Sequence, residues 1–188
     1  MARMTLLVTT FAGVLALSAA AGASAPQAQQ TQTTPQSTAA KLPDRDHDFI
    51  KDVAQASQVE IETSKLAATK ASNPEVKAFA EKLVKDHTDA TEELMALVEN
   101  KSANWPADDP GLSAKKQKHE SLQKLSGAEF DKEYLEDMIS DHESAMAMFG
   151  TYAEASKDAE IKAFAEKTLP TLTNHLKMAR DLKAKIGK

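Results

Sequence analysis

The sequence has no cysteine, so it can form neither a disulfide bond nor a thiolate metal site, and it cannot carry a lipid on an amino-terminal cysteine. Aromatic residues make up only 5% of the chain, so a core must be built mainly from alanine, leucine, valine, isoleucine and methionine. Glycine and proline are also scarce, which favours helices. Basic residues are outnumbered, with 23 Lys and Arg against 28 Asp and Glu, and this acidic balance argues against a nucleic-acid partner.

Residues 1–25 have the pattern of a signal peptide. Arg3 supplies the positive charge at the start, and an apolar run without charge follows at residues 5–21. Small residues then complete Ala-x-Ala patterns that end at Ala23 and Ala25. An uncleaved membrane anchor is the alternative, but the run is short and rich in small residues. The pattern therefore predicts export and a mature chain without a membrane span, because no other segment is long and apolar enough.

We expect the exported protein to begin after Ala23 or Ala25. Pro26 would directly follow the second cut, where proline is unfavourable, so cleavage after Ala23 is favoured. Mass spectrometry of the protein taken from the cell envelope checks this expectation. A mature protein that still begins with Met1 would contradict it.

The chain after the signal peptide divides into a spacer and one helical domain. Residues 26–43 consist mainly of Gln, Thr, Ser, Ala and Pro, with almost no charge or large apolar side chains. Such a segment cannot bury enough surface to offset the entropy lost on ordering, so a disordered spacer is predicted. From residue 44 to residue 188 the apolar side chains recur with a helical period, which predicts a single all-α domain.

Helix boundaries are indicated by capping residues and by proline. Asn73 and Pro74 form a cap and a first-turn proline, and Asp158 can cap the last helix. Ser126 and Glu129 have the spacing of a capping box. The predicted helices cover residues 46–71, 74–101, 113–125 (a short one), 126–156, and 158 nearly to the end.

The hexapeptide Lys-Ala-Phe-Ala-Glu-Lys occurs twice, at residues 77–82 and 162–167. The segments just upstream, residues 70–73 and 155–158, also resemble each other. Two similar helical hairpins joined by a long connection predict a four-helix bundle with one crossover, which carries the short helix. An elongated coiled coil is the alternative, but the short loops and the paired hairpins argue against it.

Each long helix has an apolar stripe with core-facing spacing, and one polar group interrupts each stripe. These groups are Glu60, His87, His142 and His175. At a rise of about 1.5 Å per residue, all four fall near the middle of the bundle, whichever way the crossover runs. Three imidazoles and a carboxylate at one level can bind Zn, Fe, Mn or Cu. The alternative interpretation is that each is a separately hydrogen-bonded residue of the core or its boundary.

Two further patterns lie beside these residues. Asp86 and Asp141 precede histidines, but neighbours on a helix point about 100° apart, so each is interpreted as a solvated flank or as a partner of a histidine on another helix. Met138 and Met146 flank His142 at intervals of four, and Met148 follows. Thioether and imidazole together suit copper, although methionine at this spacing is more often core filler.

Several short motifs follow one another in a fixed order along the chain. They are Asn-Pro-Glu-Val-Lys-Ala-Phe-Ala at 73–80, Asp-His at 86–87 and 141–142, Leu-Ser-Gly at 125–127, and Leu-Pro-Thr-Leu-x-x-His at 169–175. With these motifs, the chain over roughly residues 48–181 resembles the bacterial family called domain of unknown function 4142. This resemblance implies a ferritin-like fold and a periplasmic or outer-membrane location, and it implies no particular activity.

The sequence departs from the ligand pattern of ferritin-like di-iron proteins, which carry Glu-x-x-His on two helices. Val84, Ile139 and Leu172 stand three residues before the three histidines, where such glutamates would be needed. This departure argues against a carboxylate-bridged di-iron centre. No nucleophile paired with a base and no glycine-rich phosphate loop is visible, so neither catalytic residues nor an enzymatic mechanism can be assigned from the sequence.

The sequence therefore supports two interpretations of function. The first is an exported ferritin-like bundle in which Glu60, His87, His142 and His175 bind a mononuclear transition metal, for metal handling or stress protection. The second is a non-enzymatic structural or interaction protein of the cell envelope without a metal, which the missing di-iron motif and the charge-rich outer helix faces support. Metal content and metal-dependent stability separate the two interpretations.

Overall fold

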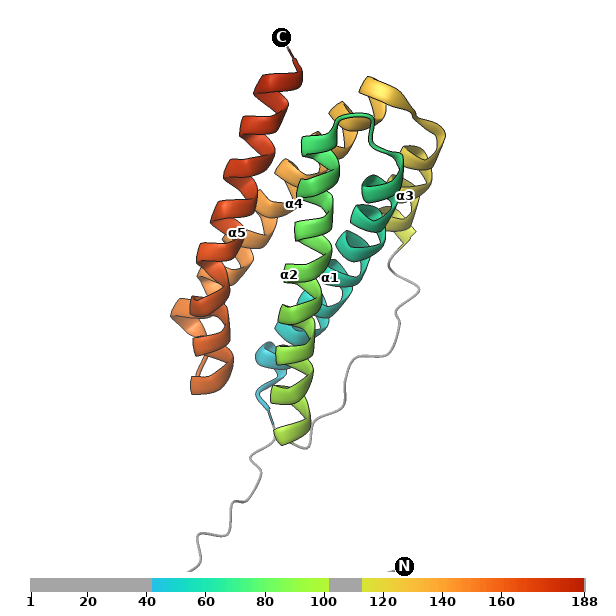
Figure 1. Cartoon of the computed structure of the whole chain (residues 1–188). Coiled ribbons are helices and arrows are strands. Elements are labelled where there is room, and N and C mark those ends of the chain that lie inside the picture. The colour runs from blue at the N-terminus through green and yellow to red at the C-terminus, as the bar shows by residue number, and fades with distance from the viewer. Residues whose placement is uncertain (1–41, 102–112, 188) are drawn as a thin grey trace, which may run out of the picture. The chain divides into compact units, whose positions relative to one another are not determined.

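The computed structural model describes residues 42–101 and 113–187, and within these ranges the chain forms five helices and no strand. Two antiparallel pairs of long helices, α1 with α2 and α4 with α5, make up the bundle, and the short helix α3 packs beside α1 and α4 (Figure 1). The predicted all-α four-helix bundle of two hairpins is thereby confirmed. The helices are α1 (Asp44–Lys70), α2 (Pro74–Asn100), α3 (Ser113–Lys124), α4 (Gly127–Ala155) and α5 (Ala159–Ile186).

The expected signal peptide, residues 1–25, lies outside the described residues, as does the expected spacer except for its last two positions. Those two positions belong to the start of the helical domain. Leu42 is buried against the apolar side chains of the bundle, and Pro43 occupies the N-cap position of α1. The first helix begins at Asp44, slightly before the predicted start at residue 46.

The two hairpins begin their second helices in the same way. The side chains of Asn73 and Asp158 each accept hydrogen bonds from two backbone N–H groups in the first turn of α2 and α5, as predicted. The capping box expected at Ser126 is not formed, because the Ser126 side chain makes no capping hydrogen bond. α4 begins instead at Gly127, whose φ of +60° lies in the left-handed region that favours glycine.

The second hairpin repeats the first at an interval of 85 residues, the distance along the chain from Lys77 to Lys162. Some equivalent positions have equivalent environments: Phe79 and Phe164, one interval apart, are both buried. In this relation α1 corresponds to α4, and α2 corresponds to α5. The repeat seen in the sequence is therefore a repeat of packing.

Buried carboxylates fix each hairpin turn to the opposite hairpin. Asp131, near the start of α4, accepts hydrogen bonds from the backbone N–H groups of Ser72 and Asn73 and from the Ser72 hydroxyl. Asp46, which precedes Asp131 by the 85-residue interval, accepts a hydrogen bond from the Ser156 hydroxyl, in the turn between α4 and α5. The start of each hairpin thus meets the turn of the other, so an approximate twofold axis crosses the bundle.

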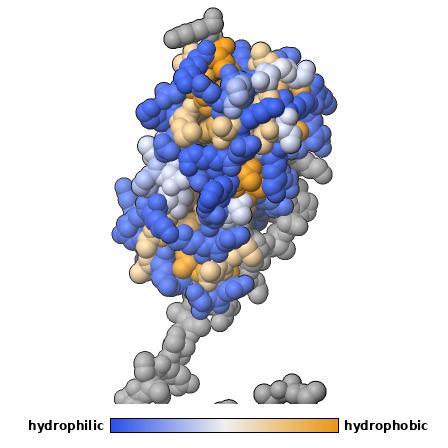
Figure 2. Space-filling model, in the orientation of Figure 1, coloured by the Kyte–Doolittle hydropathy of each residue, from blue (hydrophilic) through white to orange (hydrophobic). Residues whose placement is uncertain are grey.

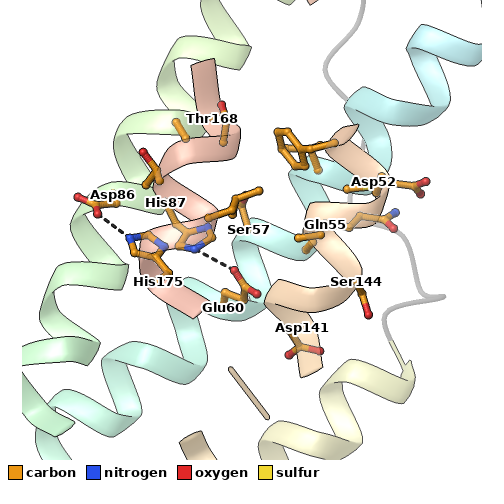
Figure 3. A pocket seen from close by; sticks show the side chains of 18 of the residues that line it. Asp52, Gln55, Ser57, Glu60, Asp86, His87, Asp141, Ser144, Thr168 and His175 are labelled. Carbon is orange, nitrogen blue, oxygen red and sulfur yellow. Dashed lines mark hydrogen bonds and ion pairs between the residues drawn. The ribbon is translucent and has the colours of Figure 1, made fainter. Parts of the chain in front are cut away.

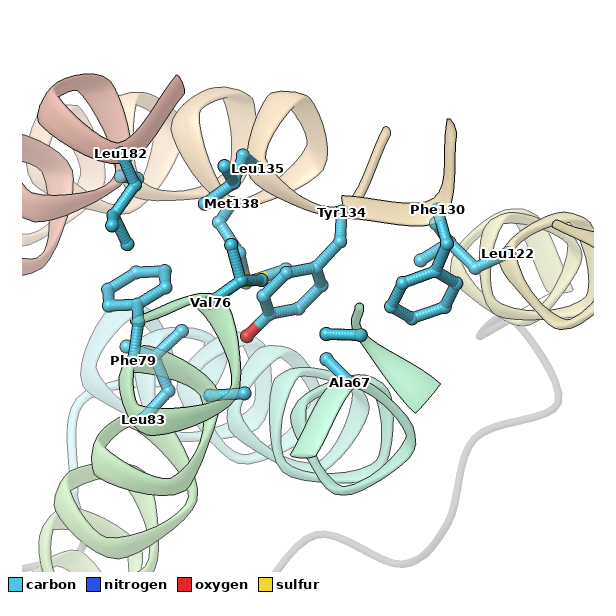
Figure 4. Close-up of a cluster of buried hydrophobic side chains, with 13 residues drawn as sticks. Ala67, Val76, Phe79, Leu83, Leu122, Phe130, Tyr134, Leu135, Met138 and Leu182 are labelled. Carbon is cyan, nitrogen blue, oxygen red and sulfur yellow. The ribbon is translucent and has the colours of Figure 1, made fainter. Parts of the chain in front are cut away.

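Two clusters of apolar side chains fill the two halves of the bundle. The first core cluster packs around Phe79, Leu83 and Tyr134, and Figure 4 shows these side chains between α1, α2 and α4. The second core cluster packs around Phe49 and Phe164. The repeat interval relates the two clusters, and the polar groups predicted from the apolar stripes lie between them.

The outer faces of the helices carry mainly polar side chains. Figure 2 shows one such face, largely hydrophilic with scattered apolar residues. Met95 is the one large hydrophobic side chain that is exposed among the residues that the structure describes. None of the described helices combines the length and the apolar character that crossing a membrane requires.

Candidate metal centre

The four polar residues predicted to face the core come together between the two core clusters. Glu60 projects from α1, His87 from α2, His142 from α4 and His175 from α5, and their exposed fractions are only 6%, 7%, 0% and 1%. Figure 3 shows Glu60, His87 and His175 pointing toward one another from three helices. The structure therefore places all four predicted residues in one layer, here called the histidine cluster, and within it only the three histidines offer ligand atoms that all lie within 4.8 Å of one another.

The three imidazoles are close enough to share one ion. Each histidine offers one ring nitrogen, and these three nitrogens lie within 4.8 Å of one another. The closest pair, His142 Nε2 and His175 Nδ1, is 3.2 Å apart. Nitrogens that share a tetrahedral zinc ion with Zn–N bonds of about 2.0–2.1 Å are roughly 3.3 Å apart. One pair already has this spacing, and the His87 nitrogen lies within 4.8 Å of both.

Glu60 lies against two of the histidines. Its Oε2 is 2.9 Å from His87 Nε2, and its Oε1 is 3.8 Å from His142 Nδ1. The shorter contact has the length of an ion pair but not the geometry of a hydrogen bond. His87 Nε2 is consequently buried without a hydrogen-bond partner among the described residues, which is an uncommon state for a ring nitrogen.

The outward-facing nitrogens of two imidazoles are held by hydrogen bonds. His142 Nδ1 donates to the carbonyl oxygen of Met138 at 2.9 Å, and His175 Nε2 donates to Asp86 Oδ2 at 2.7 Å. In neutral imidazoles these bonds place the single ring hydrogen on the outer nitrogen. The inner nitrogens, His142 Nε2 and His175 Nδ1, then face each other with lone pairs only.

Burial opposes protonation of these two imidazoles. It lowers the pKa of His175 to about 4, although the hydrogen bond to Asp86 acts in the opposite direction. Burial also lowers the pKa of His142, and the nearby Glu60 carboxylate offsets this only in part. His87 differs, because the effect of burial is outweighed by the Glu60 carboxylate, which raises the His87 pKa. The facing pair of nitrogens is therefore held in its unprotonated form.

Of the two interpretations of Asp86, the structure supports the second: Asp86 reaches across to His175 on α5, and it also pairs with Lys82 at 2.6 Å. Burial would raise the Asp86 pKa, but the hydrogen bonds from Lys82 and His175 together lower it, so the carboxylate stays ionised. Histidines that bind metals usually donate their second N–H to such a carboxylate or to a carbonyl.

Asp141 and the methionines near His142 are not members of the histidine cluster. Asp141 and Met148 line the cavity beside the histidine cluster. Met138 is buried in the first core cluster, and Met146 packs against the second core cluster. The methionines thus serve as core filler, and only Met148 lies on the wall of the space that reaches the histidines.

A cavity of about 400 Å³ lies beside the histidine cluster, lined by residues from all four long helices. Glu60, Asp86, His87 and His175 form the part of its wall that belongs to the cluster. Its lining also includes the exposed residues Asp52, Ser144 and Thr171, so the cavity reaches the surface.

The metal-free protein is expected to lose stability in mild acid because of His175. Its folded-state pKa of about 4 lies below the ordinary value of 6.5, so the unfolded chain takes up a proton first as the pH falls between these values. The free energy of unfolding should therefore decrease over this window. Denaturant unfolding between about pH 7 and about pH 5 should show a smaller decrease for His175→Gln than for the wild type. His47→Gln, at an exposed position, is the control, and an unchanged pH slope in His175→Gln would refute the assignment.

Comparison with known proteins identifies relatives by family and by fold. Residues 27–182 match the model of the family described as "Domain of unknown function (DUF4142)". No curated protein gives a significant match. Similar solved structures are a DUF305 protein from Streptomyces coelicolor, a DUF305 fragment from Deinococcus radiodurans, and CopM in its Cu(I)-bound form.

The three solved structures agree in fold with most of this chain. The Streptomyces protein is 17% identical with a TM-score of 0.66, covering 76% of this chain and 93% of its own. The Deinococcus fragment is 14% identical with a TM-score of 0.67, covering 78% and 97%. CopM is 20% identical with a TM-score of 0.62, covering 74% and 96%. At these identities the likeness establishes the fold alone.

Proposed function

The chain belongs to the family described as domain of unknown function 4142, and we propose that this member is a metal-handling protein that binds one transition-metal ion in its core. His87, His142 and His175 are the nitrogen ligands in this proposal, and Glu60 supplies a carboxylate oxygen. The location between two apolar clusters keeps these four side chains away from bulk water.

The observation that carries the proposal is the facing pair of ring nitrogens. His142 Nε2 and His175 Nδ1 are 3.2 Å apart, and both outer nitrogens already donate their hydrogens elsewhere. Two lone pairs at this distance repel each other unless a proton or a cation lies between them. Burial disfavours the proton, as the lowered pKa values of both imidazoles indicate. A metal cation satisfies both nitrogens.

The donor set limits the choice of metal. Three imidazoles and one carboxylate suit Zn, Fe, Mn and Cu, and Cu(II) and Zn should bind more tightly than Mn by the usual order of affinities. Similar folds have been solved with copper and with silver bound, in CopM, which adds support for copper. No thioether belongs to the histidine cluster, so its donors are nitrogen and oxygen atoms alone.

An exported location fits this proposal. Residues 1–25, which have the pattern of a signal peptide, lie outside the described residues, so export rests on that pattern. A ligand set without cysteine keeps its metal affinity in an oxidising compartment, where a thiolate site is prone to oxidation. We therefore place the metal-handling role in the periplasm or at the outer membrane.

A second candidate function is a structural or interaction protein of the cell envelope without a metal. Its support is that the cluster already contains internal contacts, namely His175 with Asp86, His142 with the Met138 carbonyl, and Glu60 with His87. A proton held between His142 and His175 would complete such a network. In that case the polar layer would serve only to set the register of the helices.

Thermal unfolding of metal-stripped protein without a polyhistidine tag decides between the two candidates. A ligand present at about 100 times its Kd stabilises the folded state by about 2.7 kcal/mol. For a domain of this size we expect the melting temperature to rise by roughly 5–10 °C with the preferred metal among Zn, Mn, Fe(II) and Cu(II). Binding should reach one ion per chain. No rise with any of these metals would rule out the metal-handling role and leave the structural one.

A further inference from the structure

If the histidine cluster were repeated in the other hairpin, 85 residues away along the chain, the second copy would lie where the cavity is. Each residue of the histidine cluster has an equivalent in the other hairpin, 85 positions away. All four equivalents line the cavity. For Glu60, His87, His142 and His175 the equivalents are Ala145, Leu172, Ser57 and Ala90, respectively.

The cavity is open because the side chains at most of these equivalent positions are small. On one side of the approximate twofold axis, three imidazoles and a carboxylate fill the space between the hairpins. On the other side, alanine or serine occupies three of the four equivalent positions, so the corresponding space stays open. The open volume lies where the 85-residue repeat would place a second set of three imidazoles and a carboxylate.

The cavity also touches the histidine cluster directly. Glu60, Asp86, His87 and His175 belong to its wall, so an ion bound by the cluster would lie next to open space on one side (Figure 3). A donor that enters from the cavity would be a fifth ligand beside the three imidazoles and Glu60, and zinc sites can expand from four to five ligands in this way. The volume of about 400 Å³ falls in the usual range of small-molecule sites.

The lining indicates which molecules the cavity can hold. Its charged groups other than histidine are carboxylates, and neither Lys nor Arg lines it, so anions are disfavoured. Most of the remaining wall is apolar, including Val53, Phe149 and Phe164. One polar group in this wall lacks a partner, because Gln55 Nε2 is buried without a hydrogen bond among the described residues. A compact neutral molecule with one or two polar atoms fits this combination.

We propose that the cavity is a binding site for a small neutral nitrogen donor of the size and chemistry of imidazole, which coordinates the cluster-bound metal from the open side. This proposal rests on the metal-binding function proposed above. The donor nitrogen reaches the metal, and the apolar part contacts the phenylalanines. The protein would then carry the metal together with an exchangeable external ligand.

The test uses imidazole as the probe and Co(II) as the metal, because the visible absorption of Co(II) depends on its coordination. Adding imidazole to Co(II)-loaded wild-type protein should change the spectrum in a saturable way, while ultrafiltration shows that the metal stays bound. Ala145→Leu and Ala90→Leu fill the cavity and should each weaken imidazole binding at least tenfold more than they weaken Co(II) binding. Ala147→Leu, at an exposed position of the same helix as Ala145, is the matched control.

The outcomes separate this proposal from the metal-binding function. A protein that binds no metal would overturn both. A protein that binds Co(II) but shows no spectral change with imidazole would overturn only the open site, as would release of the metal by imidazole. Equal imidazole affinity in the wild type and in both cavity-filling variants would place the probe elsewhere and would also overturn the proposal. Two variants are used so that misfolding of one leaves the test intact.

Discussion

His142→Ala is expected to lower the affinity for the metal by about 100-fold or more. The His142 side chain is completely buried, and its Nε2 faces the inner nitrogen of His175. Losing residues that only orient a ligand typically costs 10–100-fold in metal affinity, so losing a ligand should cost at least as much. Competition with a chromogenic chelator measures the change, and His47→Ala at an exposed position is the control.

Two further variants make this test specific to a shared ion. Asp86→Asn keeps every proposed ligand but weakens the hydrogen bond that orients His175, so we expect an intermediate loss of about 10–100-fold. In the metal-free protein the stability effects of His87→Gln and His175→Gln should be small beside the loss of metal stabilisation. If the two effects simply add, and metal changes neither variant nor the wild type, the residues do not share an ion.

Leu83→Ala is expected to destabilise the protein by about 2–5 kcal/mol, because it would leave a cavity in the first core cluster. Leu83 has no exposed surface and lies one helical turn before His87 on the same stripe. Denaturant midpoints measure the loss. Glu81→Ala, on the exposed face of α2, should change stability by about 0.5 kcal/mol or less. Lys82 is less suitable as a control because it pairs with Asp86. Equal losses in both variants would contradict the assigned packing.

The helices and their inward faces could be predicted because both depend on local sequence. The spacing of Leu83 and His87 by four puts them on one face of any helix, and Asn73 with Pro74 marks a helix start in any context. The scarcity of glycine and proline and the similarity of the two hairpins then leave few ways of packing the four long helices. Counting residues from the hairpin turns was enough to predict that the four polar side chains lie near the middle of the bundle, because both hairpins are nearly equal in length.

The remaining features depend on how neighbouring helices fit together. Asp86 points away from His87 on its own helix, so its contact with His175 requires the spacing between α2 and α5, which local sequence does not contain. The cap at Ser126 is not used, and α4 begins at Gly127 with a positive φ, a backbone conformation that the spacing of Ser126 and Glu129 does not reveal. The cavity, too, exists only between helices.

The reciprocal contacts of Asp46 and Asp131 with the hairpin turns suggest how such a chain could have arisen. One hairpin carries both halves of that contact, so an ancestral hairpin could have assembled with an identical copy as a twofold dimer. In such a dimer every feature would occur twice, with a Glu60 and a His87 on each side and neither side complete. After gene duplication and fusion, the two halves of the chain would be free to differ in sequence. One half could then gain His142 and His175 while the other kept small side chains at the matching places.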